Sequence, residues 1–302
     1  MKRILITGAD SYIGTSFEKW VKQPQFAGIY EVDTLDMRGD AWKEKDFSGY
    51  DSVFHVAGIA HADVGKVTEE QKKLYYKVNC DLAVETAKKA KLEGVKQFIY
   101  MSSIIVYGEG TSLQKKRVIT RQTKPSPSNF YGDSKWKAEQ KLEPLGDEWF
   151  KVAILRPPMI YGEGCKGNYR ILRKIALRVP VFPDMINERS ALFINNLCEF
   201  IQYLIDDILG GIFFPQNTAY LVTSNVVCLI AKVHGKKVYQ SKSFNWIITL
   251  LGNSPGKIGR LVNKAFGNLV YEKNMNQGII ADEAYCSYDF LESIKLTEQV
   301  KG

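Results

Sequence analysis

The sequence of 302 residues predicts an α/β protein built on a doubly wound parallel sheet with a smaller C-terminal α/β lobe. Short apolar segments alternate with longer helical patterns, which places helices on both faces of a parallel sheet. The run Val152-Ala153-Ile154-Leu155 is continuously apolar, as expected of a strand buried on both faces. We expect strands at 3–7, 30–35, 52–56, 97–102 and 151–155, and helices at 13–23, 68–92 and 131–145.

The chain begins with a predicted strand, a glycine turn and a helix. Gly8 allows a tight turn after the strand, and Gly14 allows the following helix to approach it. The N-terminus of that helix offers amide groups and a positive dipole end to a pyrophosphate. The pattern therefore predicts a Rossmann-type dinucleotide site, whose loop residues are Gly8, Asp10, Ser11, Tyr12, Ile13 and Gly14.

The second predicted strand ends at Asp36, about 20 residues after the loop, where a carboxylate can bind the adenosine ribose. This position favours NAD(H). Arg38 lies two residues further on and could instead bind a 2′-phosphate, so NADP(H) remains the alternative. Alternatively, Asp36 is a solvent-exposed acid at the end of a strand with no role in binding.

A candidate catalytic trio follows in the central part of the chain. Tyr131 and Lys135 share one face of a helix, which brings the ammonium near the phenol and should lower its pKa. Ser103 follows a hydrophobic strand and could hold a reacting carbonyl. A surface Tyr–Lys pair is the alternative, but the dinucleotide loop favours proton-coupled hydride transfer by Ser103, Tyr131 and Lys135.

Composition sets further limits. With 45% hydrophobic residues the chain can bury a large core. We expect a dinucleotide-binding core at 1–165 and a substrate-binding lobe at 166–302, with some strands returning to the core. The five cysteines lack a Cys-x-x-Cys pair, so they indicate neither a disulfide framework nor a metal site.

Composition and apolar patterning also indicate where the protein is located and what it binds. The sequence shows no secretory leader and no apolar run long enough for a membrane span, and 244–251 is interpreted as a core helix turn. A cytoplasmic location is the simplest expectation. The net charge of +8 comes from cations that look dispersed, which argues against nucleic-acid binding and favours capture of an anionic substrate.

These motifs together resemble the extended short-chain dehydrogenases/reductases of the nucleotide-sugar epimerase/dehydratase family, over essentially the whole chain. The family's loop is Gly-x-x-Gly-x-x-Gly, and Ser11 replaces its middle glycine here. The resemblance assigns the catalytic set to Ser103, Tyr131 and Lys135. It also places four further residues beside the cofactor: Val56, Ala57, Gly58 and Asn79.

The resemblance extends to substrate residues in the second half. Asn168 and Arg189 match family residues that contact the diphosphate of a nucleotide sugar, and Phe182 matches a position along the uracil. Arginine suits this role because its planar fork binds phosphate oxygens in pairs. The alternatives are a helix-capping Asn168, a core Phe182 and an ion-paired Arg189. His61 either approaches the substrate or is a hydrogen-bonded loop residue.

The motifs most resemble reductases of UDP-linked 4-keto-6-deoxy-N-acetylhexosamines used for capsule and O-antigen synthesis. This implies that NAD(P)H reduces the C4 ketone while Tyr131 donates a proton. The alternative is a UDP-hexose 4-epimerase, acting on UDP-glucose or UDP-N-acetylglucosamine with tightly bound NAD. A non-catalytic nucleotide-sensing regulator is disfavoured by the intact trio. Homodimers are common in this family.

Overall fold

The computed structural model describes residues 1–60, 67–109, 113–276 and 278–299. The chain divides into two compact units, each formed by segments that are distant in sequence. The first unit comprises Met1–Gly108, Lys124–Pro157 and Leu197–Pro215, and the second comprises Glu109–Thr123, Pro158–Asn196 and Gln216–Gly302.

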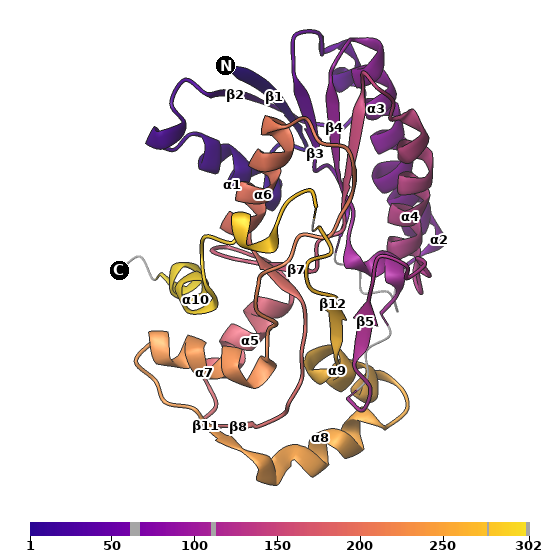
Figure 1. Ribbon diagram of the computed structural model, residues 1–302. Coiled ribbons are helices and arrows are strands. Elements are labelled where there is room, and N and C mark those ends of the chain that lie inside the picture. The colour runs from indigo at the N-terminus through magenta and orange to yellow at the C-terminus, as the bar shows by residue number, and fades with distance from the viewer. Residues whose placement is uncertain (61–66, 110–112, 277, 300–302) are drawn as a thin grey trace. The chain divides into compact units, whose positions relative to one another are not determined.

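A six-stranded parallel sheet forms the centre of the first unit, with strand order β10-β6-β4-β3-β1-β2 (Figure 1). The direction in which successive strands are added reverses between the neighbouring strands β1 and β3, as in a doubly wound sheet. The strand bounds are β1 (Lys2–Thr7), β2 (Tyr30–Leu35), β3 (Ser52–His55), β4 (Gln97–Met101), β6 (Lys151–Leu155) and β10 (Gly211–Phe213).

Helices cover both faces of this sheet. α1 and α6 lie on one face, and α2, α3 and α4 lie on the other (Figure 1). A π-helical turn at Lys77–Asp81 joins α2 to α3. The helix bounds are α1 (Tyr12–Val21), α2 (Glu69–Tyr76), α3 (Leu82–Leu92), α4 (Phe130–Leu142) and α6 (Ile194–Asp206), the last of which begins in the second unit.

The second unit contains three two-stranded parallel sheets and five complete α-helices among its described residues. The sheets pair β5 (Arg117–Ile119) with β12 (Leu269–Tyr271), β7 (Met159–Tyr161) with β9 (Ala191–Phe193), and β8 (Val181–Pro183) with β11 (Tyr239–Ser241). The helices are α5 (Asn168–Ala176), α7 (Thr223–Val233), α8 (Asn245–Gly252), α9 (Lys257–Phe266) and α10 (Phe290–Glu298).

The predicted fold class is confirmed, and the five expected strands and three expected helical segments occur close to their predicted bounds. The unit boundaries are less regular than the predicted ranges. Residues 109–123 belong to the second unit, where β5 pairs with β12. The strand that flanks β6 is β10, whereas β7 pairs with β9 in the second unit.

The segment 244–251 differs from its interpretation as part of the core. It forms most of α8, whose Trp246 and Leu250 side chains are 66% and 63% exposed. The apolar run is therefore a surface helix. Among the residues that the structure describes, no helix is long and apolar enough to cross a membrane.

Candidate active site

The three predicted catalytic residues all belong to the first unit, beside the carboxyl end of β4. Ser103 follows this strand and caps a short 3₁₀ turn, where its Oγ accepts a hydrogen bond from the Ile105 amide at 3.3 Å. Tyr131 lies in the first turn of α4, and Lys135 follows one turn later. The Ser103 hydroxyl is close enough to the Tyr131 phenol to lower its pKa. Ser103 and Tyr131 therefore lie near each other although 28 residues separate them in the sequence.

The Pro-rich segment before α4 ends in a side chain that fixes the start of this helix. Asn129 Oδ1 accepts a hydrogen bond from the Gly132 amide at 2.8 Å, a typical N-cap interaction. Gly132 has no room for a side chain, because an added Cβ would lie 2.7 Å from the Ile105 carbonyl oxygen. The first turn of α4 is thus pressed against the turn that carries Ser103.

Lys135 is 6% exposed, and its ammonium has two defined contacts. Its Nζ donates to the Met101 carbonyl at 2.8 Å and lies 4.7 Å from the centre of the Tyr100 ring. Burial lowers the pKa of Lys135 to about 8, and the charge of Glu139 partly opposes this shift. The ammonium is therefore held in one place by the end of β4.

The pKa of Tyr131 differs in direction from the sequence-based expectation. Desolvation raises it to about 12, while the hydrogen bond with Ser103 opposes this shift. The Lys135 ammonium donates to the Met101 carbonyl and not to the phenol oxygen. The phenol is thus protonated at neutral pH, the form that donates a proton to a ketone oxygen.

A buried charged network, which the sequence did not indicate, supports α4 from behind. Arg156 and Glu139 are 4% and 1% exposed, and Arg156 Nη2 lies 2.5 Å from Glu139 Oε2. Arg156 Nη1 also donates to the Tyr107 hydroxyl at 2.6 Å. The Ser102 hydroxyl donates to Glu139 as well. Of the two adjacent serines, only Ser103 is therefore directed to the phenol.

The glycine turn after β1 has the geometry that a dinucleotide loop requires. Gly8 has a φ of +106°, and a Cβ there would lie 2.6 Å from the Ala57 amide nitrogen. At Gly14, a Cβ would meet both Ser11 and side chains from β1 and the loop after β3. Ser11 is the N-cap of α1, where its Oγ accepts from the Gly14 amide at 3.1 Å. The serine that replaces the middle glycine therefore stabilises the helix start.

The ribose-binding candidates lie next to this turn. The amides of Gly8 and Ala9 both donate to the Leu35 carbonyl, at 2.9 and 3.1 Å, which fixes the end of β2 beside the loop. Asp36 follows directly and pairs with Arg38 at 2.6 Å. Both side chains are exposed, so they can reach a ribose hydroxyl or a 2′-phosphate.

The loop after β3 lies between the glycine turn and the lysine. The amides of Val56 and Ala57 donate to the Thr7 carbonyl at 3.0 and 2.9 Å. At Gly58, an added Cβ would lie 3.2 Å from Lys135 Nζ. The backbone of this loop therefore joins the predicted cofactor site to the catalytic lysine.

Asn79 holds this loop in place through its side chain. The amide is fully buried in the π-helical turn and forms a reciprocal pair with Ile59, accepting from its amide at 2.8 Å and donating to its carbonyl at 3.1 Å. It also donates to Ser134 Oγ at 3.1 Å. π-Helical turns are often found at functional sites. Asn79 is therefore a positioning residue that joins the loop to α4.

His55 is a further buried polar residue beside this site. Its Nδ1 lies 2.8 Å from Thr7 Oγ1, and its ring stacks against Phe98 and Tyr100. Burial, together with the charge of Lys135, lowers the pKa of His55 to about 3. The imidazole is therefore neutral in the folded state at every physiological pH.

We expect this depressed pKa to make the fold sensitive to mild acid. The unfolded chain binds a proton at His55 below pH 6.5 and the folded chain does not, so stability falls as pH decreases through this range. Between pH 6.5 and pH 5 the loss should be about 1.5 kcal/mol. Urea unfolding at both pH values measures it, and His55→Gln should reduce the pH dependence by that amount. An unchanged pH dependence in the variant would contradict the assignment.

The predicted substrate residues lie in the second unit. Asn168 is the first residue of α5, and the N-cap position before it is occupied by Gly167 without a side-chain cap. Phe182 is 6% exposed and stacks on Phe266 at 5.6 Å between ring centres, which leaves little of its surface for a base. His61 lies outside the described residues.

Arg189 interacts with the end of α9. Its Nη1 donates to the Lys264 carbonyl at 2.6 Å and to the Gly267 carbonyl at 3.4 Å. Among the residues that the structure describes, no carboxylate forms an ion pair with this guanidinium. Desolvation is the cause that lowers its pKa. A desolvated cation without a carboxylate partner is suited to an anionic ligand.

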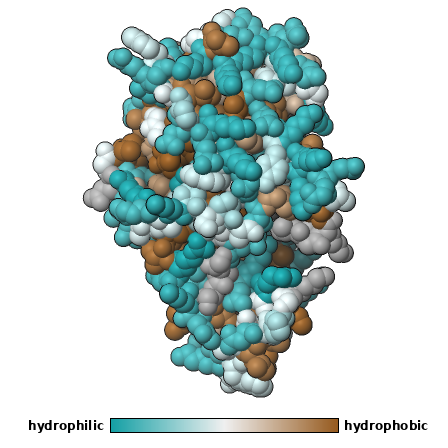
Figure 2. Space-filling view, turned by 90° about the vertical axis from the view of Figure 1, so that its right-hand side faces the viewer, coloured by the Kyte–Doolittle hydropathy of each residue, from teal (hydrophilic) through white to brown (hydrophobic). Residues whose placement is uncertain are grey.

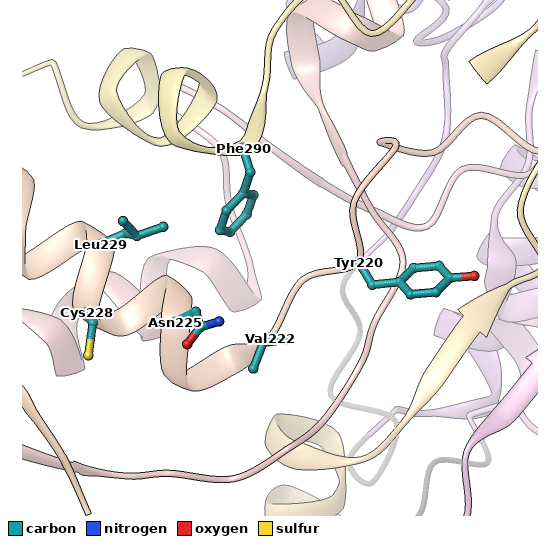
Figure 3. A pocket seen from close by; sticks show the side chains of 6 residues that line it. All are labelled: Tyr220, Val222, Asn225, Cys228, Leu229 and Phe290. Atoms are coloured by element: carbon teal, nitrogen blue, oxygen red, sulfur yellow. The ribbon is translucent and has the colours of Figure 1, made fainter. Parts of the chain in front are cut away.

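A pocket of about 350 Å³ in the second unit contains none of these residues (Figure 3). Phe290 points from the start of α10 towards α7, while the ring of Tyr220 points away from the other labelled side chains (Figure 3). The lining is mainly apolar and consists of Tyr220, Val222, Asn225, Cys228, Leu229 and Phe290. The pocket does not contribute to the predicted chemistry.

The doubly wound sheet and its glycine turn define a Rossmann-type dinucleotide-binding protein. The family model described as "NAD dependent epimerase/dehydratase family" matches residues 4–211. The chain belongs to this family.

Named relatives and a solved structure agree with the family. The UDP-glucose 4-epimerase of Vibrio cholerae is 31% identical over 287 residues, covering 89% of this chain and 86% of the relative. The N-acetyl-alpha-D-glucosaminyl-diphospho-ditrans,octacis-undecaprenol 4-epimerase of Escherichia coli O157:H7 is 29% identical, covering 69% of this chain and 64% of the relative. A UDP-glucuronic acid 4-epimerase from Bacillus cereus, solved with NAD, shares the fold with a TM-score of 0.70 at 16% identity, covering 98% and 95% of the two chains.

Proposed function

We propose that this protein is an NAD-dependent 4-epimerase of a UDP-linked hexose. The observation that carries this proposal is the 31% identity to a UDP-glucose 4-epimerase over nearly the whole chain, together with an assembled Ser103, Tyr131 and Lys135. The second relative is also a 4-epimerase and acts on a hexose attached to a diphosphate. We therefore favour epimerisation over the C4 ketoreduction that the sequence motifs suggested.

The residues of the first unit fit a bound NAD. The glycine turn provides close backbone approach, Asp36 is available to the ribose, and Lys135 lies beside Gly58. Bound NAD would accept a hydride from C4 of the sugar and return it to the opposite face. Tyr131 takes the proton of the C4 hydroxyl during oxidation and gives it back during reduction, while Ser103 orients the oxygen. The positive charge of a bound oxidised nicotinamide would favour the phenolate and so would oppose the effect of burial on Tyr131.

A C4 ketoreductase is the second candidate, because the sequence motifs resemble such reductases and the structure assembles the same trio. The Tyr131 phenol is protonated at neutral pH, as tyrosine ordinarily is, and could donate to a ketone oxygen. In this reaction hydride would pass from NAD(P)H to C4 of a UDP-4-keto-6-deoxy-N-acetylhexosamine and the Tyr131 proton would pass to O4. The two candidates share every residue of the trio.

One experiment separates the two candidates. Protein purified without added nucleotide is incubated with UDP-glucose or UDP-N-acetylglucosamine, and the product is analysed by NMR spectroscopy. An epimerase should form the C4 epimer with retained NAD and no net cofactor consumption. A reductase should leave these sugars unchanged and oxidise NADH only when a 4-keto sugar is supplied. If neither reaction occurs with the folded protein, both proposals fail.

The remaining assignments follow the same proposal. In the second unit, Arg189 and Asn168 would bind the diphosphate of the substrate. All five cysteines are free, which is consistent with work in a reducing cytoplasm. A homodimer is the assembly that the family resemblance implies.

Asp36 should determine the cofactor preference. We expect the wild-type protein to bind NADH more tightly than NADPH. Asp36→Ala should weaken this preference by about 10-fold or more, because a charged hydrogen bond to the ribose is lost and Arg38 becomes available to a 2′-phosphate. Fluorescence titration with both cofactors measures the ratio.

A matched control is available nearby in Asp40, another exposed carboxylate paired with a cation, here Lys43 at 2.8 Å. Asp40→Ala should leave the ratio unchanged. A wild-type protein that prefers NADPH would show that Arg38, not Asp36, selects the cofactor.

A further inference from the structure

Two helices of the second unit expose large apolar side chains at helical spacing. On α8, Trp246 and Leu250 lie four residues apart, so they share one face. On α9, Ile258 and Leu261 lie three residues apart and are 58% and 67% exposed. Phe244, just before α8, is also exposed. We call the exposed side chains of 242–264 the α8–α9 face.

The α8–α9 face lies in a stretch of the chain that accounts for most of the net positive charge. Between Asp207 and Glu272 the sequence contains seven Lys and Arg residues and no Asp or Glu, so the rest of the chain is nearly neutral. The cations are dispersed along the sequence, as expected, but the absence of acids concentrates the net positive charge in this stretch. Lys242, Arg260 and Lys264 are exposed, and no described carboxylate forms an ion pair with them.

Side-chain hydrogen bonds within the second unit connect the helices that carry the α8–α9 face. Asn263 Nδ2 donates to the carbonyls of Gly252 and Gly259, at 2.7 and 2.9 Å, and so ties the two helices together. Asn245 Nδ2 donates to the Asp184 carbonyl at 2.8 Å and anchors the start of α8. The exposed apolar side chains therefore belong to a folded helical pair.

We propose that the α8–α9 face docks on an anionic lipid bilayer. Tryptophan favours the boundary between lipid headgroups and acyl chains, and leucine and isoleucine can insert just below it. The neighbouring cations would meet the negative lipid headgroups. Figure 2 shows hydrophobic and hydrophilic side chains next to each other at its lower end, the level at which Figure 1 places α8.

The charge of the α8–α9 face favours a membrane over a second copy of the chain as its partner. In a two-fold dimer the same surface meets itself, so Arg260 and Lys264 of one copy would approach the like charges of the other. The described part of the segment supplies no acid to neutralise them. An anionic bilayer supplies the opposite charge, and it also accepts the apolar side chains.

Vesicle sedimentation with the full-length protein tests this proposal. Vesicles of phosphatidylglycerol should bind the wild-type protein, and vesicles of phosphatidylcholine should bind it far more weakly. Trp246→Ser with Leu250→Ser should weaken binding to phosphatidylglycerol on the order of 10- to 100-fold, because the inserted apolar area is lost. Arg260→Gln with Lys264→Gln should weaken it on the order of 30-fold and reduce its salt dependence.

Matched substitutions elsewhere provide the controls. Trp149 and Leu92 are 81% and 87% exposed in the first unit, so Trp149→Ser with Leu92→Ser removes similar groups from another surface. Arg170→Gln with Lys174→Gln removes two exposed cations with the same helical spacing from α5. All variants should keep the wild-type circular dichroism spectrum, and the controls should keep wild-type vesicle binding.

Three results would overturn the proposal. The wild-type protein could fail to bind phosphatidylglycerol vesicles, or the control variants could lose binding as strongly as the α8–α9 variants. Analytical ultracentrifugation could also show that Trp246→Ser with Leu250→Ser converts a dimer to a monomer without changing vesicle binding. That outcome would assign the face to contact between copies of the chain.

Discussion

Replacing Tyr131 by phenylalanine should lower turnover about 10²- to 10⁴-fold, the range typical of a lost general acid or base. The substitution removes one hydroxyl and keeps the ring, so its edge-on contact with Tyr75, at 6.2 Å between ring centres, should persist. The affinities for UDP and for the cofactor should therefore change little. Steady-state kinetics with calorimetry of UDP binding measures both effects.

Tyr30→Phe is the matched control for this variant. It also removes a phenolic hydroxyl from the first unit, one that donates to Asp206 at 2.8 Å. Tyr30 lies at the start of β2, at the opposite end of the parallel sheet from the trio. We expect near wild-type turnover in this variant. Turnover of Tyr131→Phe above about a tenth of wild type would remove Tyr131 from the catalytic role.

Local patterns predicted the parts of the site that short segments determine. Gly8 and Gly14 could be recognised because the backbone of a strand–turn–helix sets where glycine is needed, and the structure shows the close approaches at both residues. The four-residue spacing of Tyr131 and Lys135 placed both on α4. Such features depend on neighbours in the sequence, so one sequence is enough to find them.

Features that depend on distant contacts could not be predicted in this way. The ion pair of Arg156 and Glu139 joins the end of β6 to α4, and no local pattern distinguishes it from two solvated charges. The direction of the Tyr131 pKa shift follows from burial of the phenol, which depends on contacts with residues distant in the sequence, such as Tyr75.

Burial of a helix face is equally non-local. The apolar run that contains Trp246 resembled a core helix because apolar residues usually lie inside. Only the fold shows that its largest side chains are not covered by other described residues. The sequence also could not separate an epimerase from a reductase, because both reactions use the same trio. That choice came from similarity to whole relatives.

Arg189→Ala should weaken the binding of UDP by roughly 2–4 kcal/mol, the range for removing one partner of a desolvated charge-assisted contact. The guanidinium is partly buried and has no described carboxylate partner, so a diphosphate would supply the missing negative charge. Arg189→Lys should recover only part of the affinity, because an ammonium cannot reproduce the planar fork. Calorimetry with UDP alone makes the measurement independent of the sugar.

The carbonyl contacts of Arg189 at the end of α9 require a control for stability. Arg121→Ala is a matched variant, since Arg121 lies in the same unit and its Nε also donates to a backbone carbonyl, that of Met275. It should bind UDP like the wild type, and both variants should bind the cofactor normally, because the cofactor residues lie in the first unit. A folded Arg189→Ala protein with wild-type UDP affinity would show that another residue holds the diphosphate. The assignment of Asn168 and Arg189 would then have to be abandoned, because it rests on their order along the chain and on a guanidinium that forms no ion pair with a described carboxylate.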